Sequence, residues 1–139
     1  MKLNKARVWL GGIAGGVAWC GWSYFIGWKL NAFYAVETSR GHFLAQPRYP
    51  FFVGQWLLLI FVISILLAHL YAWSRGTLGA GPRTALKIGI IAGFIAGVPG
   101  NFGQATWSAV SRFLPLGWML DMWGGAILAT LVAGWLYKE

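Results

Sequence analysis

The chain of 139 residues is poor in the side chains that carry acid–base, nucleophilic or metal chemistry. It contains one cysteine, two histidines and three acidic residues. The acids are Glu37, Asp121 and Glu139, and neither they nor His42 and His69 cluster in the sequence. This scarcity excludes a disulfide framework and leaves no Ser/His/Asp set and no group of metal ligands. We therefore expect a protein that is not an enzyme and has no metal site.

Charge of either sign is also scarce. Charged residues make up 10% of the chain, whereas an ordinary soluble domain carries about 25%. Hydrophobic residues make up 58%, which excludes both a water-soluble domain and a disordered chain. The net charge of +8 does not indicate nucleic-acid binding, because the basic residues form no dense stripe. They fit topology signals and contacts with anionic lipid. The composition indicates one integral membrane domain over residues 1–139.

Four apolar runs are long enough to cross a bilayer as helices, each of which needs about 20 mostly apolar residues. We expect spans at about residues 8–30, 51–73, 88–113 and 116–137. These runs are too long and continuous for the alternating strands of a membrane β-barrel. The sequence predicts an all-α bundle of four transmembrane helices, with an outer loop over 31–50 and a cytoplasmic loop over 74–87.

Lysine and arginine favour the cytoplasmic side of membrane proteins, so their distribution orients the bundle. One side holds seven of them, namely Lys2, Lys5, Arg7, Arg75, Arg83, Lys87 and Lys138. The other side holds four, namely Lys29, Arg40, Arg48 and Arg112. This bias predicts that both termini are cytoplasmic. On the outer side, we expect Asn31 to Arg40 to continue the first helix, with Gly41 as its stop.

Small residues recur at every fourth position in each span. The glycines of this pattern that we expect at helix contacts are Gly11, Gly15, Gly89, Gly93 and Gly97. Lipid provides little hydrophobic drive between helices, so close approach of their backbones carries the packing. The pattern predicts a compact bundle, a homo-oligomer, or both, and it also suits packing against other membrane subunits.

A faint repeat relates the two halves of the chain. The segment Gly11–Ala18 matches Gly89–Ala96 at five of eight positions, and Pro50 and Pro115 open the second and fourth spans. One interpretation is a duplicated two-helix hairpin, and the other is chance similarity between apolar sequences.

The third span carries a proline followed by a polar stripe. Pro99 lacks an N–H and should kink or break the helix. Beyond it, Asn101, Gln104 and Ser108 have the spacing i, i+3, i+7, which places them on one helical face. Polar groups at this depth are costly in lipid unless they find partners.

Asp121 is the one acid inside a span, and a membrane-buried acid is a hypothesis of function by default. Counted along the helices, it reaches the depth of the polar stripe, as do Gln55 in the second span and Ser23 in the first. We expect Arg112 to pair with it. Together with the stripe, these side chains are expected to line a polar pocket open to the outside. The alternative is that they only hold helices together.

His69 is the candidate cofactor ligand, because a neutral imidazole can bind haem iron or the magnesium of a chlorin. His42 is expected on the opposite side of the membrane, which argues against a bis-histidine haem. The alternative for His69 is a hydrogen bond to a neighbour. Trp19, Trp56 and Trp123 lie deeper than the interfacial belts, so their indole N–H groups need acceptors.

In size, in its Trp-rich span ends and in its Gly/Pro-interrupted third span, the chain resembles the many small four-helix membrane proteins of bacteria, which implies the bacterial inner membrane. Small multidrug transporters have an acid in the first span, and this chain has none there. Three hypotheses of function remain. The first is an accessory or structural subunit of a larger membrane complex. The others are a small oligomeric transporter or channel using the Asp121 pocket, and a pigment- or haem-binding subunit using His69.

Overall fold

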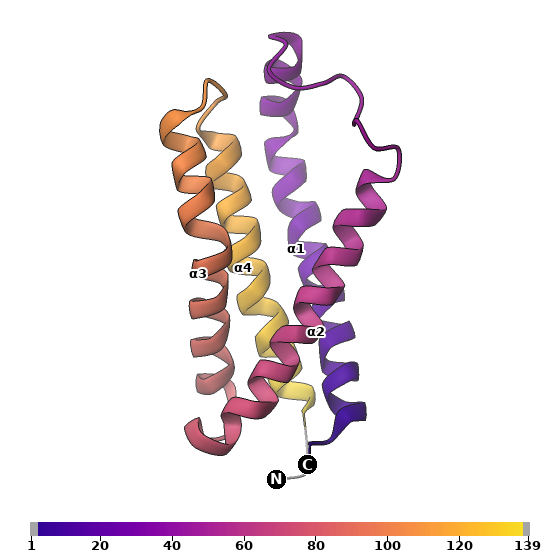
Figure 1. Ribbon diagram of the computed structural model, residues 1–139, viewed down its shortest axis with the longest axis vertical. Coiled ribbons are helices and arrows are strands. Elements are labelled where there is room, and N and C mark those ends of the chain that lie inside the picture. The colour runs from indigo at the N-terminus through magenta and orange to yellow at the C-terminus, as the bar shows by residue number, and fades with distance from the viewer. Residues whose placement is uncertain (1–2, 138–139) are drawn as a thin grey trace.

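The computed structural model describes residues 3–137 as a bundle of four helices. The helices are α1 (Lys5–Ser39), α2 (Phe52–Leu78), α3 (Pro82–Trp107) and α4 (Phe113–Leu136). They run alternately up and down, and α4 packs against all three others (Figure 1). The closest packing joins α4 to α1 and to α3, while α2 packs mainly against α1. Lys2 and Lys138, used above to orient the chain, lie outside the described residues.

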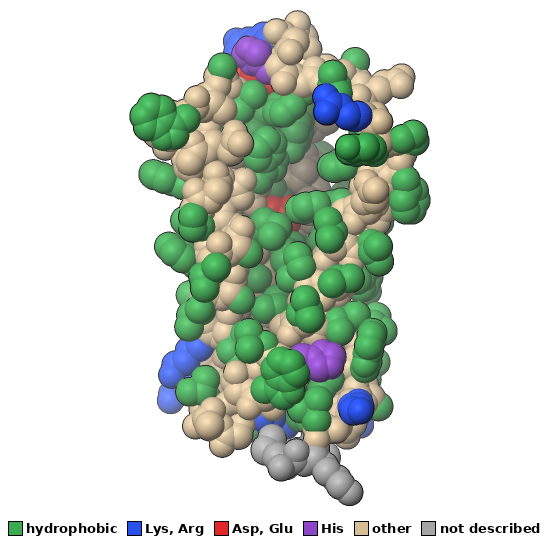
Figure 2. Space-filling view, viewed as in Figure 1, with side chains coloured by type: hydrophobic (Ala, Val, Ile, Leu, Met, Phe, Trp, Pro, Cys, Tyr) green, Lys and Arg blue, Asp and Glu red, His purple; other side chains and the backbone are tan. Residues whose placement is uncertain are grey.

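Three of the helices, α2, α3 and α4, are long and apolar enough to cross a membrane. Large hydrophobic side chains such as Leu58, Ile91 and Ile95 are exposed on their outer faces, as expected for surfaces that meet lipid. Figure 2 shows this apolar cover over the length of the bundle, with the basic side chains towards its ends. α1 is the longest helix at 35 residues but is not among these three, because glycine, tryptophan and tyrosine dilute its apolar residues.

The helix ends differ from the predicted ones where glycine and proline decide them. α2 runs on to Leu78 and α3 already starts at Pro82, so the predicted loop over 74–87 shrinks to three residues. Gly79 and Gly81 have φ of +84° and +125°, which makes this tight reversal possible. Pro82 then occupies the first turn of α3, where its missing N–H costs nothing.

At the other end of the bundle, α1 continues past its predicted span through residues 31–39, which confirms the predicted extension. It ends in a Schellman motif at Gly41, whose φ is +77°. The N–H of Gly41 donates to the carbonyl of Thr38, and the N–H of His42 donates to the carbonyl of Glu37. This cap fixes the direction in which the outer loop leaves the helix.

α3 runs through Pro99 as one helix, so of the predicted kink or break, the break does not occur. Only the bond that the Pro99 nitrogen would donate is lost, and the helix is held along its length by packing against α4. α3 does end earlier than predicted, at Trp107, with extended backbone at Ser108. The residues from Ser108 to Arg112 therefore form a turn and not the last turn of a spanning helix.

The glycines singled out in the sequence pack inside this bundle. Gly11 and Gly15 of α1 face Ala133 and Ala129 of α4. The α3 glycines also face α4, where a Cβ on Gly89 would lie 2.7 Å from the Cα of Ile127. Positions matched by the faint repeat, such as Gly11 and Gly89, thus pack on the same helix and not on equivalent partners. The small-residue faces are occupied within the chain.

Candidate functional site

Asp121 lies on the face of α4 that meets α1 and is only 8% exposed. Two side chains of α1 donate hydrogen bonds to it. The indole N–H of Trp19 donates to Oδ1 at 3.1 Å, and the hydroxyl of Ser23 donates to Oδ2 at 2.6 Å. From α2, the indole of Trp56 donates to the Ser23 oxygen at 3.4 Å. A chain of polar contacts therefore joins three helices at one depth.

The donors fix the direction of the hydrogen bonds that link Trp56, Ser23 and Asp121. An indole nitrogen can only donate, so the Ser23 oxygen accepts from Trp56 and its own proton points to Asp121. Both oxygens of Asp121 are then acceptors, which is the pattern that an ionised carboxylate satisfies. The site is arranged to hold a negative charge with neutral donors.

The predicted partner of this acid, Arg112, does not pair with it. Its guanidinium lies over the ring of Phe113, 5.7 Å from the centroid. Arg112 precedes α4, and from there to Asp121 the helix rises about 13 Å, which is beyond the reach of an arginine side chain. Among the acids within residues 3–137, only Glu37 forms ion pairs. Asp121 therefore has no cation of the described chain beside it.

A cavity of about 1030 Å³ opens next to this carboxylate. Its walls come from all four helices and are mostly apolar and aromatic. Its polar side chains include Ser23, Asn101 and Asp121, and its rings include Tyr24, Trp56 and Trp118. Figure 2 shows the hollow on one face of the bundle, with acidic surface at its floor. We call it the Asp121 cavity.

The remaining residues of the predicted pocket do not all reach this cavity. Asn101 lines it, with its Nδ2 donating to the Gly97 carbonyl at 2.7 Å. Gln104 and Ser108 instead line a smaller hollow of about 320 Å³ near the end of α3. Gln55 is exposed on α2 and lines neither, while its neighbour Trp56 reaches the site. The predicted set is therefore divided between two places.

His69, the candidate cofactor ligand, has a structural hydrogen bond. Its Nδ1 donates to the carbonyl of Ile65 at 2.8 Å, which leaves Nε2 as the nitrogen with a lone pair. The rings of Trp9 and Trp73 lie 6.3 and 5.8 Å away. His42 belongs to the opposite end of the bundle, beyond α1. No three His, Cys, Asp or Glu side chains gather as a metal site within residues 3–137.

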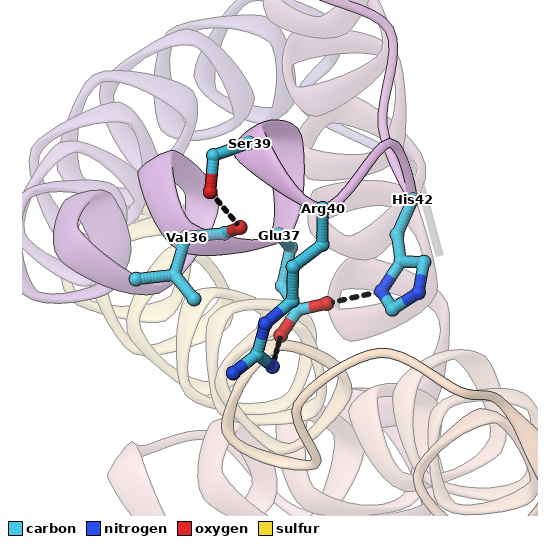
Figure 3. A network of polar contacts seen from close by, with 5 residues as sticks. All are labelled: Val36, Glu37, Ser39, Arg40 and His42. Carbon is cyan, nitrogen blue, oxygen red and sulfur yellow. Dashed lines mark hydrogen bonds and ion pairs between the residues drawn. The ribbon is translucent and has the colours of Figure 1, made fainter.

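Sequence reasoning missed a second acid that is buried although it lies in the predicted outer loop. Glu37 is only 1% exposed. Its carboxylate accepts from the Arg40 guanidinium at 3.2 Å and from Nδ1 of His42 at 2.5 Å (Figure 3). The spacing Glu37, Arg40, His42 at the end of a helix is the signal that would have indicated this cluster.

The pKa of the Glu37 carboxyl lies below its ordinary value. The hydrogen bond from His42 is the main cause, and it outweighs the opposite effect of burial. The backbone N–H of Ser111 and the charge of Arg40 lower the pKa further. Since Ser111 belongs to the turn between α3 and α4, Glu37 connects the end of α1 to that turn.

The Glu37 cluster also places the residue that follows it against the cavity. Phe43 packs on Tyr34 and Trp118, with ring centroids 5.9 and 6.3 Å away, and lines the Asp121 cavity. The indole of Trp118 donates to the hydroxyl of Tyr34. The start of the outer loop therefore forms part of the wall at this end of the bundle.

Comparisons of the chain with protein-family models, with curated proteins and with solved structures found no match.

Proposed function

We propose that this protein is a small membrane carrier that binds an amphipathic molecule in the Asp121 cavity. The observation that carries the proposal is the cavity itself, about 1030 Å³ of mostly apolar and aromatic wall around one buried carboxylate. Sites for small molecules have this composition and typically measure about 300–1,000 Å³. An acid inside a spanning helix is costly to bury, which favours a role in binding.

The Asp121 cavity is an open hollow between the helices and not an enclosed void. Protein interiors are close-packed, with few voids larger than a water molecule. The other half of this same bundle follows that rule, since Gly15 would place a Cβ only 2.6 Å from the Ala129 carbonyl. The chain therefore packs α1 tightly on α4, and the open space in the other half lies along α2.

That contrast favours a carrier over a channel. Below the cavity, Trp19 is fully buried and α1 meets α4 in backbone contact at Gly11 and Gly15. This half leaves no room for a continuous pore. A carrier needs a site that is open on one side and closed on the other, with a helix free to move. α2, which packs mainly against α1 and only lightly against α3 and α4, is the helix we assign to that movement.

The proposal includes α1 as the fourth span and adopts the charge bias for orientation. The Glu37 end then faces outwards, both termini are cytoplasmic, and the carrier resides in a bacterial inner membrane. The accessory-subunit hypothesis loses its main support, because the small-residue faces on which it rested are occupied inside the chain. Stable co-purification with other membrane chains would restore it.

The single cysteine of the chain supplies a test, because Cys20 lines the cavity. In lipid nanodiscs, the uncharged water-soluble reagent 2-hydroxyethyl methanethiosulfonate should modify Cys20. A matched pair in a Cys20→Ser background checks the cavity wall. Ala96→Cys lines the cavity and should react, whereas its neighbour Ile95→Cys, 68% exposed towards lipid, should not.

Mass spectrometry of the intact protein measures both reactions. An unreactive Cys20 together with an unreactive Ala96→Cys would overturn the proposal, because water would then not reach the cavity.

A further inference from the structure

We infer that the molecule held in the Asp121 cavity is an amphipathic cation, with its positive group against the Asp121 carboxylate and its apolar part on the aromatic walls. This inference rests on the proposed function and names the chemical class of its ligand. The first step is the charge of Asp121, which two neutral donors stabilise and no cation within residues 3–137 neutralises.

The basic side chains nearest in sequence to the site are engaged elsewhere. Lys29 of α1 lies over the ring of Trp28, with its Nζ 4.5 Å from the centroid, and Trp28 is exposed. Arg112 lies over Phe113. A carboxylate in an apolar setting is costly without a counter-charge. A bound cation would supply that counter-charge from outside the chain.

The walls of the cavity also select against an anion. The two indole N–H groups along it are already used, that of Trp56 on Ser23 and that of Trp118 on Tyr34. The amide of Asn101 donates to its own helix. An anionic ligand would therefore find few free donors, no positive group and the repulsion of Asp121.

A cation finds favourable contacts in the same place. Trp56, Trp118 and Tyr24 contribute aromatic surface to the wall, and the π faces of such rings attract ammonium and similar groups. The apolar remainder of the cavity takes alkyl or aryl substituents. The volume of about 1030 Å³ exceeds what a bare metal ion or a proton needs and suits an organic cation.

Cys20 allows this preference to be measured without knowing the natural ligand. Three methanethiosulfonates of similar size are compared in nanodiscs, carrying 2-hydroxyethyl, 2-sulfonatoethyl and 2-(trimethylammonio)ethyl groups. Each transfers its thioalkyl group to the thiolate and releases methanesulfinate. Their rates at Cys20 are divided by their rates with a free thiol in solution. A cleft of one sign raises the local concentration of counter-ions at least about tenfold, so the cationic reagent should lead the anionic one by that factor.

Two variants test whether the preference for the cationic reagent depends on the Asp121 carboxylate. Asp121→Asn removes the charge, and the ratio of cationic to anionic rates should fall towards the solution value. Asp121→Glu keeps the charge, and the ratio should persist. Any effect of Asp121 on the ionisation of the Cys20 thiol changes the rates of all three reagents by the same factor and cancels in the ratio. Helical content and elution volume show that each variant is folded before its rates are compared.

The outcomes separate this inference from the proposed function. Equal relative rates for the cationic and anionic reagents, with the neutral reagent still reacting, would overturn the cation preference and leave the cavity as a site for a neutral molecule. The same conclusion follows if the ratio survives in Asp121→Asn. Failure of all three reagents at Cys20, together with an unreactive Ala96→Cys, would overturn the proposed function itself.

Discussion

The hydroxyl of Ser23 on α1 donates a 2.6 Å hydrogen bond to the carboxylate of Asp121 on α4. This contact joins two positions 98 residues apart and fixes the depth at which the two helices meet. The same hydroxyl oxygen accepts a hydrogen bond from the indole of Trp56 on α2, which connects that helix to the carboxylate. One serine therefore connects the tightly packed α1–α4 pair to the loosely packed α2.

The hydrogen bond that Ser23 donates should contribute more to stability than the one that Trp56 donates. Ser23→Ala deletes a short bond to a carboxylate and leaves the Trp56 N–H without its acceptor. We expect a loss of about 1–2 kcal/mol in unfolding free energy. Trp56→Phe deletes only the longer 3.4 Å bond and should cost less through hydrogen bonding. Unfolding in graded detergent mixtures measures both.

Ser39→Ala is the control for this comparison. Ser39 lies at the exposed end of the same helix, where its hydroxyl donates to the Val36 carbonyl. Its replacement should change the unfolding free energy little. If Ser23→Ala were as mild as Ser39→Ala, the polar chain around Asp121 would contribute nothing to the joining of α1 and α4.

Two glycines of α1 should respond oppositely to the same substitution. At Gly15 an added Cβ would lie 2.6 Å from the carbonyl oxygen of Ala129, and backbone must move to admit it. Gly15→Ala should therefore cost about 1–3 kcal/mol, the usual penalty of overpacking. At Gly21 a Cβ would meet nothing within 4 Å, so Gly21→Ala should be neutral or stabilise by up to about 1 kcal/mol through helix propensity. Equal effects at the two sites would contradict the backbone contact between α1 and α4.

The sequence was sufficient to predict the four helices and the need of three indoles for hydrogen-bond acceptors. Trp19, Trp56 and Trp123 each required an acceptor, and each has one, namely Asp121, Ser23 and the carbonyl of Ile90. The length of each span predicts which indoles lie deep in the bundle. A buried donor must find an acceptor whichever way the helices pack.

The sequence was insufficient where an exact helix end or rotation mattered. Asp121 lies eight residues after the start of α4, about 12 Å along its axis. The same distance counted back from Trp107 on α3 falls near Pro99. Asn101 therefore lies close to the depth of Asp121, whereas Gln104 and Ser108 do not. Because the third span was predicted to end at residue 113, the polar stripe was placed too deep in the bundle.

Rotation explains the error on α2. Successive residues of a helix point about 100° apart, so Gln55 and Trp56 share a depth but face different ways. The packing of Gly12 and Gly16 of α1 against Ile65 and Phe61 sets this rotation, and such a contact between distant segments is not visible in a periodicity. Glu37 was missed for a related reason, since the turn that buries it comes from α3 and α4.

Both ends of the described chain should lie on one side of the membrane. The backbone N–H of Asn4 donates to the hydroxyl of Tyr137 at 3.1 Å, so the start of α1 and the end of α4 meet. The charge bias predicts that this side is the cytoplasm. A C-terminal green fluorescent protein fusion should therefore fluoresce, and a C-terminal alkaline phosphatase fusion should be inactive. The reverse pattern would show that the Glu37 end faces the cytoplasm.

Acid should loosen the end of the bundle that contains Glu37. Because its pKa is lowered in the folded protein, mainly by the hydrogen bond from His42, the ionised carboxylate stabilises the fold. This contribution is fully present above the ordinary glutamate pKa of about 4.3. It is lost as the pH falls from that value through the lower pKa of the folded state. Over that window the thermal stability of the native protein should decline.

Glu37→Gln shows whether this carboxyl is the cause. The glutamine keeps the shape and does not titrate, so this variant should be less stable than the native chain at pH 6 and should converge with it as the pH falls through the lowered pKa of Glu37. Since Phe43 follows His42 and lines the Asp121 cavity, acid should also open the cavity at Ala96→Cys, which is tested in a Cys20→Ser background. Methanethiosulfonates react with the thiolate, so each labelling rate is divided by the rate of a free thiol at the same pH. This relative rate should rise in acid in the chain that keeps Glu37 and stay flat in Glu37→Gln. Parallel pH profiles for the two proteins would show that Glu37 does not fasten this end of the cavity.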